Sequence, residues 1–76
     1  MAKITAILHP GVTGAIPERT ERTVSIRDGE TVRELERKLH LPAGTVTILI
    51  DNRVADTTDV LHDGNVVECY PLFSGG

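Results

Sequence analysis

Aromatic residues, cysteine and long apolar runs are all scarce in this sequence of 76 residues. Tyr70 and Phe73 are its only aromatic residues, so we expect an aliphatic core. Cys69 is the single cysteine, which excludes an intrachain disulfide, a thiolate zinc cage and an iron–sulfur cluster. The longest apolar runs reach three residues, whereas a helix that spans a bilayer needs roughly 20.

Basic residues are outnumbered as well. Eight Lys and Arg stand against eleven Asp and Glu, which gives a formal net charge of −3. This balance argues against nucleic-acid binding driven by phosphate contacts and is compatible with a basic protein partner. The first residues lead into an alternating segment without a signal-peptide core, so we expect a cytoplasmic protein with no membrane association. With 39% hydrophobic and 25% charged residues, the chain should fold as one small domain.

Alternation of apolar and polar residues predicts the strands. They are expected at residues 3–9, 20–27, 45–50, 53–55 and 66–72. The first two pair as a hairpin. Asp51-Asn52, between the third and fourth, reads as a two-residue turn of residue types that tolerate positive φ.

One helix is predicted between the second and third strands. Thr31 and Glu34 have the spacing of a capping box, which marks its start. Val32, Leu35 and Leu39 recur at helical spacing and should pack inward. The helical residues expected to face solvent are Arg33, Glu36, Arg37 and Lys38.

This order of elements predicts an α+β protein. It is the order of the ubiquitin-like β-grasp, a mixed four- to five-stranded sheet packed on one main helix. We expect residues 1–73 to form this domain and residues 74–76 to form a flexible diglycine tail.

The sequence ends in Gly75 and Gly76. Glycine has no side chain to clash, so such a tail can lie extended in a narrow enzyme channel. Extended, residues 73–76 would reach roughly 13–14 Å, at about 3.3–3.6 Å per residue. The group delivered to a partner would be the Gly76 α-carboxylate.

The segment from Leu61 to Gly76 resembles the C-terminal signature of the ThiS/MoaD sulfur-carrier family. It shares with that family a leucine, an Asp-Gly turn at 63–64, an alternating strand, an aromatic–proline step at 70–71 and a terminal Gly-Gly. Residues 50–54 look like the family's hairpin, with Asn52 in place of the common glycine.

The resemblance implies a carrier rather than an enzyme, with no bound cofactor. An adenylating enzyme of the ubiquitin-activating type would use ATP to convert the Gly76 carboxylate to an acyl adenylate. A persulfide sulfur donor, such as a cysteine desulfurase, would then yield a thiocarboxylate. Its sulfur would pass to a molybdopterin-synthase large subunit or a thiazole synthase. Tyr70-Pro71 favours the molybdopterin branch, whereas the short length favours the thiamine branch.

Strand alternation also predicts a docking surface. Six residues are expected to face the helix: Ile4, Ala6, Val46, Ile48, Val67 and Cys69. Ile7, Leu49 and Tyr70 should then point from the opposite face as one exposed apolar patch, although single exposed apolar residues are common. With Phe73, these are the predicted contacts to the activating enzyme.

The remaining reactive residue types form no catalytic constellation. Cys69 alternates inward and is predicted to be a packing thiol. His9, His40 and His62 lack metal-ligand spacing, so no metal site is expected and they are interpreted as surface or capping residues. Two other functions stay open: a ubiquitin-like modifier conjugated through Gly76, and a β-grasp interaction module whose glycines are incidental.

Overall fold

The computed structural model describes residues 2–11, 18–41 and 44–72 of the chain. Its elements follow the predicted order, and the strand ends agree with the prediction to within one residue. They are β1 (Ala2–Leu8), β2 (Thr20–Ile26), α1 (Val32–Lys38), β3 (Val46–Ile50), β4 (Arg53–Val54) and β5 (Val66–Pro71).

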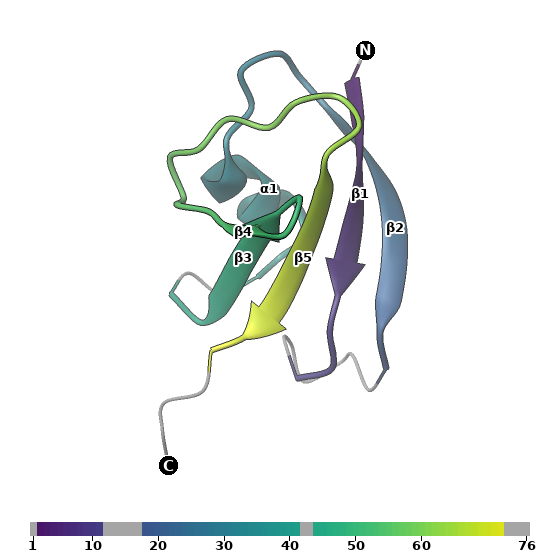
Figure 1. Ribbon diagram of the computed structural model, residues 1–76, viewed down its shortest axis with the longest axis vertical. Helices are drawn as coiled ribbons and strands as arrows, with labels where there is room; N and C mark the ends of the chain where they lie inside the picture. Colours follow the sequence, from purple (N-terminus) through teal and green to yellow (C-terminus); the bar gives the residue numbers. More distant parts are fainter. Residues whose placement is uncertain (1, 12–17, 42–43, 73–76) are drawn as a thin grey trace.

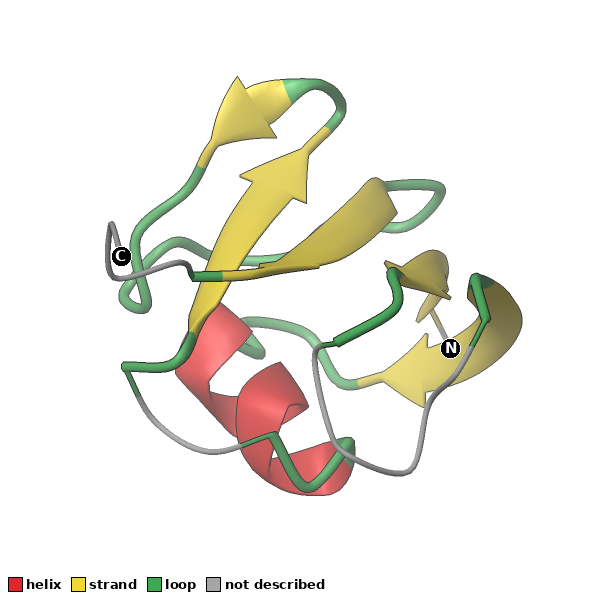
Figure 2. Ribbon diagram, turned by 90° about the horizontal axis from the view of Figure 1, so that it is seen from below, coloured by secondary structure: helices red, strands yellow, loops and turns green. Residues whose placement is uncertain are grey.

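The five strands form one sheet in the order β2-β1-β5-β3-β4. β1 runs parallel to β5, whereas the β1–β2, β3–β4 and β3–β5 pairs are antiparallel, so the sheet is mixed as predicted. α1 lies across one face of this sheet (Figures 1 and 2). We call the face turned away from α1 the outer face. β5 is the central strand and therefore contributes side chains to the middle of both faces.

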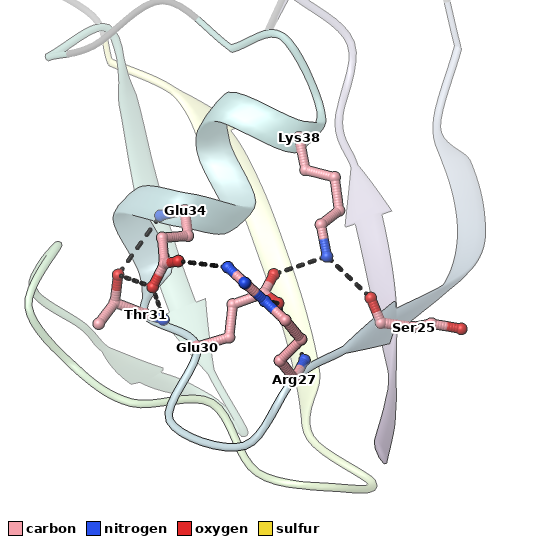
Figure 3. Close-up of polar contacts among 6 residues, drawn as sticks. All are labelled: Ser25, Arg27, Glu30, Thr31, Glu34 and Lys38. Carbon is pink, nitrogen blue, oxygen red and sulfur yellow. Dashed lines mark hydrogen bonds and ion pairs between the residues drawn. The ribbon is translucent and has the colours of Figure 1, made fainter. Parts of the chain in front are cut away.

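The start of α1 is the capping box that the sequence predicts. The Glu34 N–H donates to Thr31 Oγ1 at 3.4 Å, and the Thr31 N–H donates to Glu34 Oε1 at 3.1 Å (Figure 3). A helix of seven residues owes its stability mainly to packing, here by the buried Val32 and Leu35. No helix in the described part of the chain has the length and apolar character needed to cross a membrane.

The β3–β4 hairpin turns at Asp51 and Asn52, whose φ angles are 49° and 70°. Positive φ at both central residues is the backbone that a tight hairpin turn requires. The predicted turn is confirmed.

The core lies between α1 and the inner face of the sheet, and it is aliphatic apart from the Cys69 thiol. Val67 and Cys69 of the central strand have no exposed surface. The buried cluster consists of Ile4, Leu8, Ile26, Val32, Leu35, Leu41, Ile48, Leu61, Val67 and Cys69.

Two glutamates are buried, and only one of them, Glu36, was the subject of a prediction. Glu36 was expected to face solvent but is 6% exposed. It follows Val32 by four positions, so both lie on the inward face of the helix. Burial raises the pKa of Glu36, and the nearby Arg33 charge only partly opposes this. Glu30, which precedes the helix and was assigned no role, is 2% exposed.

Candidate functional site

The predicted transfer site, Gly75 and Gly76, lies outside the described residues, as does Phe73. The structure does describe the end of β5 that leads toward them. The Leu72 N–H donates to the Thr45 carbonyl at 3.0 Å. On the other side, a Cβ built on Gly11 would stand 3.5 Å from the Pro71 ring, so the backbone there packs closely on Pro71. Neighbours on two sides therefore hold the end of β5.

The other predicted residues do come together on the outer face. Glu68 in β5 lies in register with Ile7 of β1 on one side and Leu49 of β3 on the other. Tyr70 stands two positions further along β5, on the same face. Ile7, Leu49 and Tyr70 thus surround Glu68.

Their exposure differs from the prediction in one case. Tyr70 is 37% exposed and Leu49 is half-buried, but Ile7 is only 7% exposed. The expectation of an exposed Ile7 is wrong, because its register partners on both neighbouring strands, Glu21 and Glu68, carry long side chains beside it.

Val54 is an outer-face residue that the prediction missed. It is 77% exposed and pairs with Leu49 across the β3–β4 hairpin. In a hairpin with a two-residue turn at Asp51-Asn52, Val54 pairs with Leu49. The position of Val54 on the outer face could therefore have been predicted from the sequence. The apolar area of the outer face therefore extends from Tyr70 and Leu49 to Val54.

A polar cluster occupies the middle of this apolar area. The Tyr70 hydroxyl donates to Glu68 Oε2 at 2.8 Å, and His9 Nε2 lies 3.1 Å from the same oxygen. Since a carboxylate only accepts, Nε2 must carry the proton. The His9 and Tyr70 rings are stacked, with centroids 4.0 Å apart and planes 9° apart. We call Glu68, Tyr70 and His9 the Glu68 cluster.

These hydrogen bonds favour the ionised form of Glu68. The Tyr70 hydroxyl, followed by His9, holds the pKa of the Glu68 carboxyl below its ordinary value, so it is a carboxylate at neutral pH. The same hydrogen bond raises the pKa of Tyr70. His9 was predicted to be a surface or capping residue. Its role in the cluster depends on parallel pairing of β1 with β5, which extends beyond Leu8 through the His9 N–H to the Cys69 carbonyl.

Cys69 points to the opposite side of β5, and the predicted packing thiol is confirmed. Burial, and then the Glu36 charge, raises the pKa of Cys69 to about 12. The charge that acts on the thiol thus belongs to Glu36 in the helix rather than to Glu68, its neighbour in the sequence. A thiol that stays protonated at neutral pH is a poor nucleophile. In the described part of the chain, no three His, Cys, Asp or Glu side chains gather as metal ligands would.

Comparison with known proteins supports the fold. No protein-family model matches the sequence, and no curated protein matches it. Among solved structures, SAMP1 from Haloferax volcanii superposes with a TM-score of 0.77 at 15% identity, over 99% of this chain and 100% of that one. Ubiquitin from Caldiarchaeum subterraneum superposes with a TM-score of 0.62 at 18% identity, over 99% of this chain and 100% of that one. A ubiquitin-like protein from the same hyperthermophile superposes with a TM-score of 0.61 at 17% identity, over 96% of this chain and 99% of that one.

At these identities the likeness shows the fold. The chain has the ubiquitin-like β-grasp fold, and its described residues form one helix against a mixed five-stranded sheet, as predicted. The fold that the resemblance to the ThiS/MoaD family implies is confirmed.

Proposed function

We propose that this chain is a sulfur carrier protein that acts through the α-carboxylate of Gly76. One observation carries the proposal: in a ubiquitin-like fold, the central strand β5 ends at Pro71 and is followed by a diglycine at residues 75–76. Two residues without side chains suit the passage of an acyl group into a partner's active site.

The proposed chemistry takes place in the active sites of partners. In an adenylating enzyme, a Gly76 carboxylate oxygen attacks the α-phosphorus of ATP, and pyrophosphate leaves. The terminal sulfur of a persulfide donor then attacks the acyl carbon of the adenylate, and AMP leaves. A thiol reduces the resulting acyl disulfide, which releases the Gly76 thiocarboxylate and leaves a disulfide on the donor side. The thiocarboxylate sulfur finally attacks an electrophilic carbon in a precursor of molybdopterin or of the thiamine thiazole. Water then hydrolyses the resulting thioester, which leaves the sulfur on the product and restores the Gly76 carboxylate.

In this scheme the chain is a co-substrate rather than an enzyme. ATP binds to the adenylating partner, and the chain supplies the carboxylate and a surface for recognition. We propose the outer face as that surface, with Leu49, Tyr70 and Val54 in contact and the largely buried Ile7 across β5 from Leu49. Phe73, which lies outside the described residues, stays a predicted contact. Tyr70→Ala and Leu49→Ala should weaken binding to the adenylating enzyme while circular dichroism stays that of the folded domain. Wild-type affinity in both variants would refute the docking assignment.

The central test is the mass of the intact protein after incubation with ATP, the adenylating enzyme of the same organism and a persulfide donor. A carrier gains the mass difference between one sulfur and one oxygen atom. The matched control lacks Gly75 and Gly76 and should remain unchanged. Protein isolated from its own cells should end at Gly76, since the activated group is its free carboxylate. A wild-type protein that is never adenylated would refute the proposal.

A protein modifier is the second candidate, favoured by the fold shared with Caldiarchaeum ubiquitin. Here the acyl group passes from the adenylate to an enzyme thiol, and then to a lysine ε-amine as an isopeptide. The same incubation with cell extract would give heavier protein conjugates instead of a thiocarboxylate. If removal of Gly75 and Gly76 leaves complementation of a deletion strain intact, both candidates fail and an interaction module with incidental glycines remains.

A further inference from the structure

Glu68 is an ionised side chain set in the middle of an apolar area. In register, Ile7 and Leu49 flank it, and Val54 follows Leu49 on the edge strand. The Glu68 side chain is 19% exposed. It is therefore accessible at the outer face yet already separated from much of the solvent.

The two oxygens of this carboxylate differ. Both hydrogen bonds of the Glu68 cluster go to Oε2, from the Tyr70 hydroxyl at 2.8 Å and from His9 Nε2 at 3.1 Å. No described residue donates to Oε1. The His9 and Tyr70 rings stack on each other, and their two hydrogen bonds fix the orientation of the carboxylate. One oxygen is thus positioned by the fold, and the other is left to an outside donor.

A partner that covers the outer face removes water from the charged Glu68 carboxylate. Removing an ionised carboxylate from water is unfavourable unless a donor of opposite charge replaces the water. Arg19, whose charge contributes a little to the lowered pKa of Glu68, has a side chain that is 55% exposed, and its Nη2 lies 3.7 Å from Glu21 Oε1. Its guanidinium is therefore directed to another carboxylate of the same face. A purely apolar partner surface would remove water from Glu68 and supply no donor to its Oε1.

We propose that Glu68 determines partner specificity at the outer face by accepting, at Oε1, a guanidinium from the adenylating enzyme. Leu49 and Val54 contact apolar side chains around that arginine. Arginine fits better than lysine, because the guanidinium is more weakly hydrated and is favoured in ion pairs that lose solvent. The inference rests on the proposed function, in which an adenylating enzyme is the partner.

The experiment measures pyrophosphate release by the adenylating enzyme with ATP as the concentration of the carrier is varied. Glu68→Gln keeps the shape of the side chain and removes its charge. Asp28→Asn is the matched control, since Asp28 is exposed in the turn before α1 and each variant changes the net charge from −3 to −2. We expect Glu68→Gln to raise KM about tenfold or more with little change in kcat, because a buried charge pair is lost. Asp28→Asn should keep the wild-type KM.

Two further readouts separate recognition from folding. Glu68→Gln should have the circular dichroism spectrum and the urea midpoint of the wild type. Glu68→Asp, which keeps the charge, should have a KM between those of the wild type and Glu68→Gln. Equal losses in Glu68→Gln and Glu68→Asp would overturn the inference, as would a wild-type KM in Glu68→Gln. In both cases the wild type still releases pyrophosphate and the proposed function stands. If the wild type releases none, it is the proposed function that fails.

Discussion

Two glutamates of this domain each have two close partners, but the partners are of different kinds. Glu30 is closed off, with a side chain that is 1% exposed. Its Oε1 accepts from the Arg27 N–H at 2.9 Å, and its Oε2 lies 2.7 Å from Lys38 Nζ, in an ion pair rather than a well-aligned hydrogen bond (Figure 3). Glu68 remains partly open, and its donors are a tyrosine and a histidine.

The partners of Glu30 belong to the segments that it joins. Lys38 Nζ also donates to the Ser25 carbonyl at the edge strand β2, at 2.9 Å. The Arg27 guanidinium donates to Glu34 Oε2 at 3.0 Å (Figure 3). The chain supplies cations for Glu30 and so ties β2 to α1. A carboxylate paired with the chain's own cations in a closed site is structural, whereas one held by a tyrosine and a histidine on an open face is available to a partner.

The largest effect that would test this comparison is on stability. Glu30→Gln should lower the free energy of unfolding by about 2 kcal/mol, because Lys38 and the Arg27 N–H lose a buried anion. Glu68→Gln is the matched control and should change it by less than about 0.5 kcal/mol. Urea unfolding followed by circular dichroism measures both. Equal losses in the two variants would contradict the structural role of Glu30.

Acid should remove part of the same stabilisation. Burial raises the pKa of Glu30, but Lys38 and Arg27 outweigh it and leave the pKa below the ordinary 4.5. A depressed pKa in the folded state gives stability that is present above pH 4.5 and lost as pH falls through the folded value. The free energy of unfolding should therefore fall below pH 4.5, and less steeply in Glu30→Gln. Parallel acid curves for the two proteins would argue against this coupling.

The parts of the molecule that could be predicted from sequence are those fixed by local rules. The Thr31–Glu34 capping box spans four residues, the turn at Asp51-Asn52 requires only positive φ at its two central residues, and alternation along β5 places Cys69 in the core. Each depends on neighbours in the chain. For this reason the fold could be predicted even though no family model matches.

The parts that were missed depend on distant pairing. His9 and Glu68 are 59 positions apart and meet only because β1 runs parallel beside β5. The burial of Glu30 depends on its ion pair with Lys38, the last residue of α1, which is eight positions away in the sequence. Charged side chains are usually exposed, so residue type alone indicates exposure for Glu30 and Glu36. Only the tertiary packing shows that both are buried.

A smaller loss is expected at the helix start. Thr31→Ala removes the acceptor for the Glu34 N–H and should lower the free energy of unfolding by about 1 kcal/mol, as for other helix caps. Thr58→Ala is the control, since Thr58 is exposed in a turn. Urea unfolding of both variants measures the difference. If Thr31→Ala matches Thr58→Ala, the capping box adds nothing beyond the Glu30 ion pair beside it.

The smallest change in stability should come from Tyr70→Phe, which removes one partly exposed hydroxyl and keeps the ring stacked on His9. We expect less than about 0.5 kcal/mol in unfolding free energy. The pKa of Glu68 should nevertheless rise toward its ordinary 4.5, because the Tyr70 hydroxyl is the main cause of its depression. Carboxyl carbon NMR titration measures the Glu68 and Glu30 pKa values in the same sample. Glu30 should titrate unchanged, because Lys38 and Arg27 set its pKa. A Glu68 pKa unaffected by Tyr70→Phe would mean that the Tyr70 hydroxyl does not hold this carboxylate, and its Oε1 would then lose the fixed position that recognition of a guanidinium requires.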